Sequence, residues 1–199
     1  MGLAAAINRG MSQLPASVTF ATWLGDDDLL TDDSLTKARD ALSGSGDAVM
    51  VFGSCEYIDE KGRTLVVIKS GQFAPWLLRI GPQLLPQPGS LFLLSAYREL
   101  GGLDTTLHGA FDLDLFIRLK KLGSRFIFIP VVLSKFRWHR ESLSVQSRKT
   151  ITREASTVRV RHLSPVLRAL SFLWEPWVTW LILRASSLMT RRLHKVSRE

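Results

Sequence analysis

The chain has 199 residues, 46% hydrophobic and 22% charged, a composition that fits one ordered globular domain and excludes a disordered chain. The net charge is +8, yet residues 1–134 hold 12 Lys and Arg against 14 Asp and Glu, whereas residues 135–199 hold 14 against 4. The basic character therefore belongs to the tail, and the single cysteine, Cys55, excludes an internal disulfide and a cysteine-rich zinc site.

The first two thirds of the chain predict helices and strands in alternation. Residues 2–11 are rich in alanine and predict a helix, the apolar residues 18–24 a strand, and residues 31–42 an exposed helix. Further strands are expected at residues 48–59, 64–68, 90–94 and 125–130 with an extension to 139, and a compact helix after residue 110. A helix that leads straight into a buried strand normally follows another strand in an α/β sheet, so we expect an amino-terminal part before Met1.

Three adjacent aspartates, Asp26, Asp27 and Asp28, follow the first predicted strand. Open α/β sheets bind ligands beyond the carboxyl ends of their strands. Three neighbouring carboxylates repel one another, and a bound cation would relieve that repulsion. Their oxygen atoms suit Mg²⁺ or Mn²⁺, with a diphosphate supplying further ligands. The alternative is a solvated acidic turn that caps the next helix.

Two more aspartates, Asp112 and Asp114, lie in the first turn of the compact helix predicted after residue 110. Carboxylates at this position complement the helix dipole, which is one interpretation of the pair. The other interpretation is that one of them serves as a general base that faces the metal site.

Four segments in the right order resemble the family 2 glycosyltransferases. In chain order they are residues 6–10, 24–28, 100–104 with 111–115, and 136–139 followed by Ser142 and Ser144. In the same order, they resemble four segments of that family: the helix ahead of the metal strand, the Asp-x-Asp metal motif, the acceptor-side block with the catalytic base, and the closing basic and histidine segment. The resemblance covers residues 1–144 and implies an α/β protein with the GT-A fold, a Rossmann-like mixed sheet flanked by helices.

The resemblance also implies an activity and its residues. A sugar would pass from a nucleotide-diphospho-sugar to a glycan or lipid-linked acceptor, as in cell-surface polysaccharide assembly, by one inverting displacement. Mg²⁺ or Mn²⁺ held by Asp26 and Asp28 would bridge the two phosphates and neutralise the leaving group. Asp112 is implied as the base, and Asp114 is expected to act as a helix cap or a supporting group. The residues expected to contact the donor are Asn8, Asp26, Asp27, Arg137 and His139.

The chain also departs from the family pattern. The strands that hold the nucleotide base would lie before Met1, and Pro86 and Gln87 stand where many relatives have His-Gln or His-Pro. A rival interpretation follows from the missing strands: an inactive, truncated remnant that acts as a membrane-associated or protein-binding module. The acidic motifs oppose that interpretation.

The tail, residues 145–199, combines an apolar helical face with a basic end. The face consists of Leu163, Val166, Leu167, Leu170, Leu173, Trp174, Trp177 and Leu181. Pro176 is expected to kink the helix, and the longest run without charge or proline is far shorter than the ~20 residues needed to cross a bilayer.

Two partners fit this tail. A Trp-bearing face beside the basic residues Arg191, Arg192 and Lys195 suits an anionic membrane, which would make the protein cytoplasmic and peripheral. Packing on its own domain or on a second subunit is the alternative. Nucleic acid is not an expected partner, because the basic residues alternate with a wide Trp and Leu face.

Overall fold

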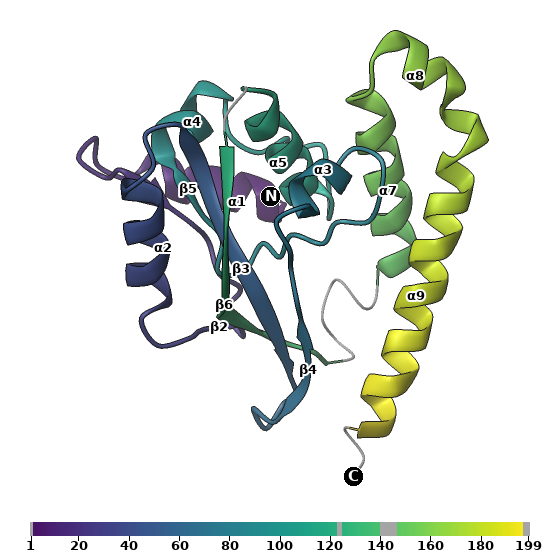
Figure 1. The fold of residues 1–199 in the computed structure, drawn as a ribbon, viewed down its shortest axis with the longest axis horizontal. Helices are drawn as coiled ribbons and strands as arrows, with labels where there is room; N and C mark the ends of the chain where they lie inside the picture. Colours follow the sequence, from purple (N-terminus) through teal and green to yellow (C-terminus); the bar gives the residue numbers. More distant parts are fainter. Residues whose placement is uncertain (1, 123–124, 140–146, 197–199) are drawn as a thin grey trace.

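The computed structural model describes residues 2–122, 125–139 and 147–196. It is a mixed α/β structure in which helices flank one curled sheet (Figure 1). The predicted mixed α/β class is thereby confirmed.

The sheet is built around two long parallel strands, β3 (Ala48–Ile58) and β6 (Arg125–Arg137). All the other described pairings are antiparallel. The order in the sheet is β1 (Phe20–Ala21), β5 (Leu91–Leu93), β3, β6 and β2 (Leu29–Leu30), with β4 (Thr64–Ile68) paired to β3. The register places Phe52 opposite Phe128, and it shifts just after Phe52. Gly53 lies at this shift, where a methyl group would come within 2.6 Å of the Val131 carbonyl, so only glycine allows the two strands to approach this closely.

The two faces of the sheet carry separate apolar layers, because successive side chains of a strand point to opposite faces. Val51 of β3 packs with Ala38 and Leu42 of α2 (Ser34–Ser43). The larger core contains Met50 and Phe52 together with side chains of several helices, including Val158 of the tail and residues of three helices of the first part of the chain. Those helices are α1 (Leu3–Ser12), α4 (Leu94–Glu99) and α5 (Phe111–Lys121).

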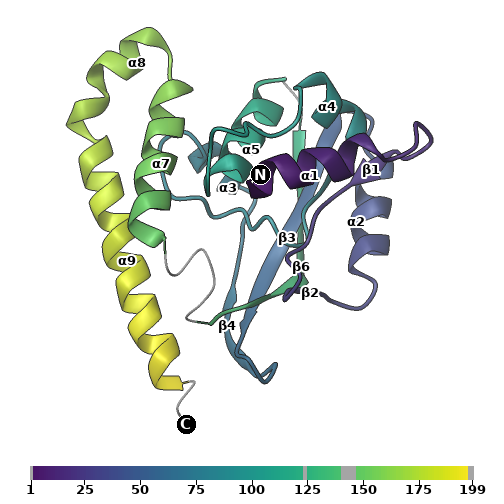
Figure 2. The same ribbon diagram turned by 180° about the vertical axis from the view of Figure 1, so that it is seen from behind.

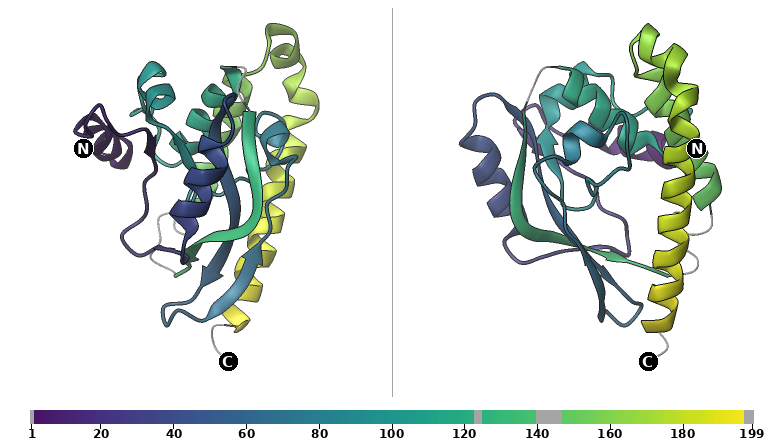
Figure 3. Two further views of the ribbon diagram at one scale, coloured as in Figure 1. Left: turned by 60° about the vertical axis from the view of Figure 1, so that its left-hand side comes forward. Right: turned by 45° about the vertical axis from the view of Figure 1, so that its right-hand side comes forward.

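The tail forms a helical hairpin beside this sheet. Its elements are α7 (Arg148–Arg161), α8 (Pro165–Leu170), the 3₁₀ turn η1 (Ser171–Leu173) and α9 (Glu175–Val196). Figures 1 and 2 show α7 and α9 side by side, with α8 at the bend. An ion pair between the buried residues Arg159 and Glu175, at 2.7 Å, joins the two long helices. Figure 3 shows the full length of α9 along one side of the molecule.

Three details differ from the sequence-based prediction. The first strand is two residues long instead of seven, since it pairs only with the short β5. The tail breaks at η1 and Trp174 instead of kinking at Pro176. Pro176 is the second residue of α9, in the first turn, where a proline costs no helical hydrogen bond. The short helices α3 (Ala74–Leu77) and α4 were not predicted.

Candidate functional site

The three adjacent aspartates lie between β1 and β2 on a turn formed by residues 25–28, here called the acidic turn. The turn closes where the backbone N–H of Asp28 donates a hydrogen bond to the carbonyl of Gly25 at 3.3 Å. Asp26 is exposed, Asp27 is half-buried and Asp28 is buried. The three carboxylates therefore differ in their access to solvent, which their sequence does not indicate.

Arg137, the last residue of β6, holds the acidic turn in place. Its backbone N–H donates to Asp28 Oδ1 and its Nε donates to the carbonyl of Asp27, both at 3.0 Å. Its Nη1 donates to the carbonyls of Asp59 and Glu60, just beyond β3, at 2.9 and 3.0 Å. The guanidinium thus ties the turn to the ends of both central strands, a structural task in addition to the donor contact predicted for it.

His139 lies two residues beyond β6 and contacts the same turn. Its Nε2 is 2.8 Å from Asp27 Oδ2. Together with Arg137 it brings the predicted basic segment onto the predicted metal motif. The roles of these residues toward a donor stay predictions, and Ser142 and Ser144 of the same segment lie outside the described residues.

Two carboxylate oxygens of the acidic turn face one small space above Gly25. A methyl group on Gly25 would lie 2.8 Å from Asp28 Oδ2 and 3.2 Å from Asp27 Oδ1. Neither oxygen accepts a hydrogen bond from any residue in the described ranges. Burial raises the pKa of Asp28, and the charges of Asp27 and Asp26 raise it further, although a hydrogen bond from the Arg137 backbone lowers it. A cation in this space would stabilise the ionised turn.

These ligands fit a small cation shared with a diphosphate. Mg²⁺ commonly takes one or two protein carboxylates and completes its shell with water and substrate phosphates. Within the described ranges, no group of three or more His, Cys, Asp or Glu is arranged to hold a metal. Asp27 and Asp28 each offer one carboxylate oxygen near Gly25. The predicted pairing of Asp28 with Asp26 stays a prediction, and Asp26 has no hydrogen bond to other described residues.

Asp112 lies in the first turn of α5, where two groups bind its carboxylate. The side chain Nε2 of Gln83 donates to Oδ2 at 2.8 Å, and the backbone N–H of Leu113 donates to Oδ1 at 2.7 Å. Burial raises the pKa of Asp112, and these hydrogen bonds oppose the shift only in part. A carboxylate with a raised pKa has more affinity for a proton than an exposed one, as a general base requires.

The loop of residues 82–88 connects this aspartate to the acidic turn. One glutamine of the loop holds Asp112, and a second, Gln87, donates from Nε2 to the carbonyl of Trp23 at 2.7 Å. Trp23 lies two residues before the acidic turn, and its ring centroid lies 6.5 Å from that of Phe111. One loop thus contacts both Asp112 and the segment that leads into the acidic turn. Sequence reasoning noted Gln87 as a departure from the family pattern but missed Gln83, whose only signal is its place between prolines in an irregular segment.

Asp114 is part of a buried ionic network. Its Oδ2 accepts from Arg118 Nε at 2.6 Å, and its Oδ1 lies 2.7 Å from Nε2 of His162 at the end of α7. Arg118 also donates to the carbonyls of Leu100 and Gly102 at 3.0 and 2.8 Å. Burial alone would raise the pKa of Asp114, but His162 and Arg118 hold it below its usual range. Of the two roles expected for Asp114, these contacts match a supporting group and not a simple helix cap, because the carboxylate joins α5 to the tail.

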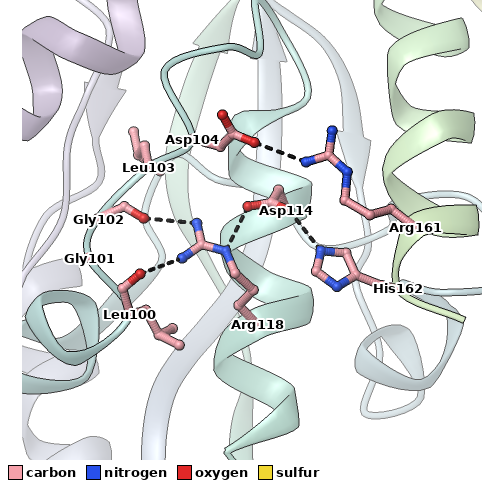
Figure 4. A pocket seen from close by; sticks show the side chains of 9 residues that line it. All are labelled: Leu100, Gly101, Gly102, Leu103, Asp104, Asp114, Arg118, Arg161 and His162. Atoms are coloured by element: carbon pink, nitrogen blue, oxygen red, sulfur yellow. Dashed lines mark hydrogen bonds and ion pairs between the residues drawn. The ribbon is translucent and has the colours of Figure 1, made fainter. Parts of the chain in front are cut away.

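A hollow of about 280 Å³ opens beside this network (Figure 4). It is lined by residues 100–104, by Asp114 and Arg118 of α5, and by Arg161 and His162 of the tail. Figure 4 shows Arg161 reaching across it to Asp104, at 2.9 Å. No residue of the acidic turn lines the hollow, so it is separate from the candidate site.

Asn8 is bonded to the loop that follows α4. Its Nδ2 donates to the Leu103 carbonyl at 2.9 Å, and its Oδ1 accepts from the Leu103 N–H at 2.8 Å and from the Tyr97 hydroxyl. Gly102, with φ +79°, makes room for this contact, since a methyl group there would lie 2.6 Å from Asn8 Oδ1. The amide thus holds α1 against the acceptor-side block, and its predicted contact with a donor stays a prediction.

The candidate site therefore has two acidic centres joined by one loop. One is the acidic turn with Arg137 and His139, and the other is Asp112 at the start of α5. Comparisons with known protein families and with curated proteins found no match for the chain. The arrangement offers oxygen ligands for a cation at one centre and a proton acceptor at the other.

Proposed function

We propose that the protein is a metal-dependent glycosyltransferase with a GT-A fold, similar to family 2. It transfers a sugar from a nucleotide-diphospho-sugar to a hydroxyl group of a glycan or lipid-linked acceptor, as in cell-surface polysaccharide assembly. The observation that carries the proposal is the convergence of Arg137 and His139, more than a hundred residues away in sequence, on the acidic turn. A solvated helix-capping turn would not need either contact.

The turn supplies the donor side of the proposed site. A divalent cation bound by Asp28, with Asp27 or Asp26 as the second ligand, would neutralise the charge of the diphosphate leaving group. His139 orients Asp27 through Oδ2, which leaves Oδ1 facing the space above Gly25. The guanidinium of Arg137 adds a fixed positive charge next to the turn.

Asp112 supplies the acceptor side. It accepts the proton of the acceptor hydroxyl as that oxygen forms its bond to the anomeric carbon of the sugar, while the bond from that carbon to the diphosphate breaks. The nucleoside diphosphate leaves with the bonding electron pair, so one direct displacement inverts the anomeric centre. Gln83 fixes one carboxylate oxygen and keeps the side chain in one orientation during the transfer.

The proposal predicts that donor binding depends on both the metal and Asp28. Calorimetric titration of the chain with uridine, guanosine and thymidine diphosphates should give binding to at least one nucleotide when Mn²⁺ is present and none when it is chelated. Asp28→Asn should abolish the metal-dependent part, because it removes a charged ligand that the diphosphate cannot replace. Comparing Asp26→Asn with Asp27→Asn would identify the second ligand.

Asp40→Asn is the matched control, since Asp40 lies on α2 in an exposed ion pair with Arg39 and should not affect binding. Failure of the unaltered chain to bind any of the three nucleotides with Mn²⁺ would contradict the proposal. That result would favour the alternative of a non-catalytic membrane-associated or protein-binding module.

A further inference from the structure

The bend of the tail hairpin exposes a continuous set of large apolar side chains, here called the apolar tail surface. It consists of Val166, Leu167, Leu170, Phe172, Leu173, Trp177, Trp180 and Leu181. Phe172 is 68% and Trp177 67% exposed, so the bulk of these rings faces away from the protein. Soluble proteins rarely leave a cluster of this kind uncovered unless it contacts a partner.

Polar side chains join the two long helices of the hairpin. Arg159 binds Glu175 at 2.7 Å, Thr179 donates to the second oxygen of Glu175 at 2.8 Å, and Arg148 of α7 donates to the Thr190 hydroxyl of α9. Leu163, which the sequence assigned to the same face, is buried at 5% exposure. The exposed side chains therefore form a surface presented by an otherwise well-fixed hairpin.

The basic charge of the tail indicates which kind of partner covers the apolar tail surface. Residues 135–199 carry ten more basic than acidic side chains, and Arg184 lies over the Trp180 ring at 5.4 Å, at the edge of the apolar tail surface. Tryptophan next to arginine is typical of the boundary between lipid headgroups and acyl chains. A basic margin of this kind is complementary to an anionic lipid headgroup layer.

The shape of the hairpin limits how deeply it can enter a lipid bilayer. No single helix in the described residues is long and apolar enough to cross a membrane. Residues 165–173 and 175–185 reach the required length and composition only together, and they meet at a 60° bend. A bent apolar pair of this length fits a shallow insertion with its bend in the headgroup region.

We propose that the apolar tail surface docks the protein on the interfacial layer of a bilayer that contains anionic lipid. The bend at η1 enters the headgroup and acyl boundary, while Arg184 stays at the headgroups. The docking does not depend on the enzymatic activity, so vesicle binding tests it without any substrate.

The experiment is co-sedimentation of the full chain with vesicles of phosphatidylcholine alone or mixed with phosphatidylserine. The chain should bind the mixed vesicles more tightly at low salt than at high salt. Trp177→Ser should weaken binding to both vesicle types about tenfold, because it removes a large inserted ring. Arg184→Ser should weaken binding only to the anionic vesicles, by about fivefold, the effect of one basic residue near such a surface.

Two matched controls come from α2, which lies at the opposite end of the molecule from α9 in Figures 1 and 2. Leu35→Ser removes an apolar side chain that is 45% exposed, and Arg39→Ser removes an exposed charge. Both variants should bind vesicles like the unaltered chain.

Two results would overturn the proposal. The first is that the chain remains in the supernatant with anionic vesicles at low salt. The second is that sedimentation velocity without lipid shows a dimer that Trp177→Ser dissociates, which would assign the surface to a second copy of the chain.

Discussion

At the scale of single residues, Asp112 shows a conflict between stability and the proposed chemistry. Burial raises its pKa, so the folded protein disfavours the ionised carboxylate that a base needs. Ionising the side chain in the folded protein costs free energy, and the hydrogen bonds from Gln83 and the Leu113 backbone reduce that cost. That cost exists above the unfolded-state pKa, near 3.8, and disappears when the side chain is protonated in both states.

Asp112→Asn should therefore make the protein more stable at pH 7 while removing the base. The gain arises because the amide carries no charge to desolvate, and it should shrink toward zero at about pH 4, where the aspartate is itself protonated. Thermal unfolding at both pH values measures the difference, with the exposed Asp40→Asn as the control that should show little gain. A variant that is less stable than the unaltered chain at pH 7 would mean that Asp112 is favoured as an ion.

At the scale of elements, the tail helix α7 holds the start of α5. The carboxylate of Glu154 accepts hydrogen bonds from three consecutive backbone N–H groups, those of residues 108–110, at 2.7 to 2.8 Å. Burial alone would raise the pKa of Glu154, but these donors hold it below its usual range. Gly109 allows the close packing, since a methyl group there would lie 2.4 Å from Ile151. The helix that carries Asp112 thus begins from a segment fixed by the tail.

Glu154→Ala should destabilise the protein by about 1–3 kcal/mol, because it leaves three backbone donors, two of them partly buried, without their acceptor. Urea unfolding measures the loss. Glu99→Ala is the matched control, as Glu99 is exposed at the end of α4 and should change the free energy of unfolding by less than about 0.5 kcal/mol. Equal effects of the two substitutions would contradict the proposed hold of α7 on α5.

At the scale of the whole molecule, the core domain and the tail are joined through α5 and α7. His162 and Glu154 of the tail contact α5 and the segment before it, and Arg159 joins α7 to α9. The apolar tail surface therefore has a fixed orientation relative to Asp112. A protein docked through that surface would hold its acceptor side at a constant angle to the membrane.

The sequence predicted the elements that depend on local pattern. The apolar runs that became β3, β4 and β6 and the periodic helix α5 follow directly from side-chain spacing. The two-residue lengths of β1 and β2 could not be predicted, since strand length depends on which partner pairs with it. The break of the tail at η1 also escaped prediction, because the Arg159–Glu175 pair that orients α9 joins residues from separate helices.

The residues of the candidate site are likewise indicated by the sequence, whereas the contacts that position them are not. Asp26, Asp27, Asp28 and Asp112 stand out in the sequence because charged groups cluster beside apolar runs. The contacts that position them, from Gln83 to Asp112 and from the Arg137 backbone to Asp28, join distant segments and have no local signal.

Sugar transfer itself tests the central claim most directly. Nucleoside diphosphate release should be measured from a panel of nucleotide sugars with Mn²⁺ and a mixture of glycan and lipid-linked acceptors, for the unaltered chain and for Asp112→Asn. The account predicts release by the unaltered chain and a loss of about 10²–10⁴-fold in the variant, whose calorimetric donor binding should persist. Equal release by the two proteins, or no release from any donor by the unaltered chain, would contradict it.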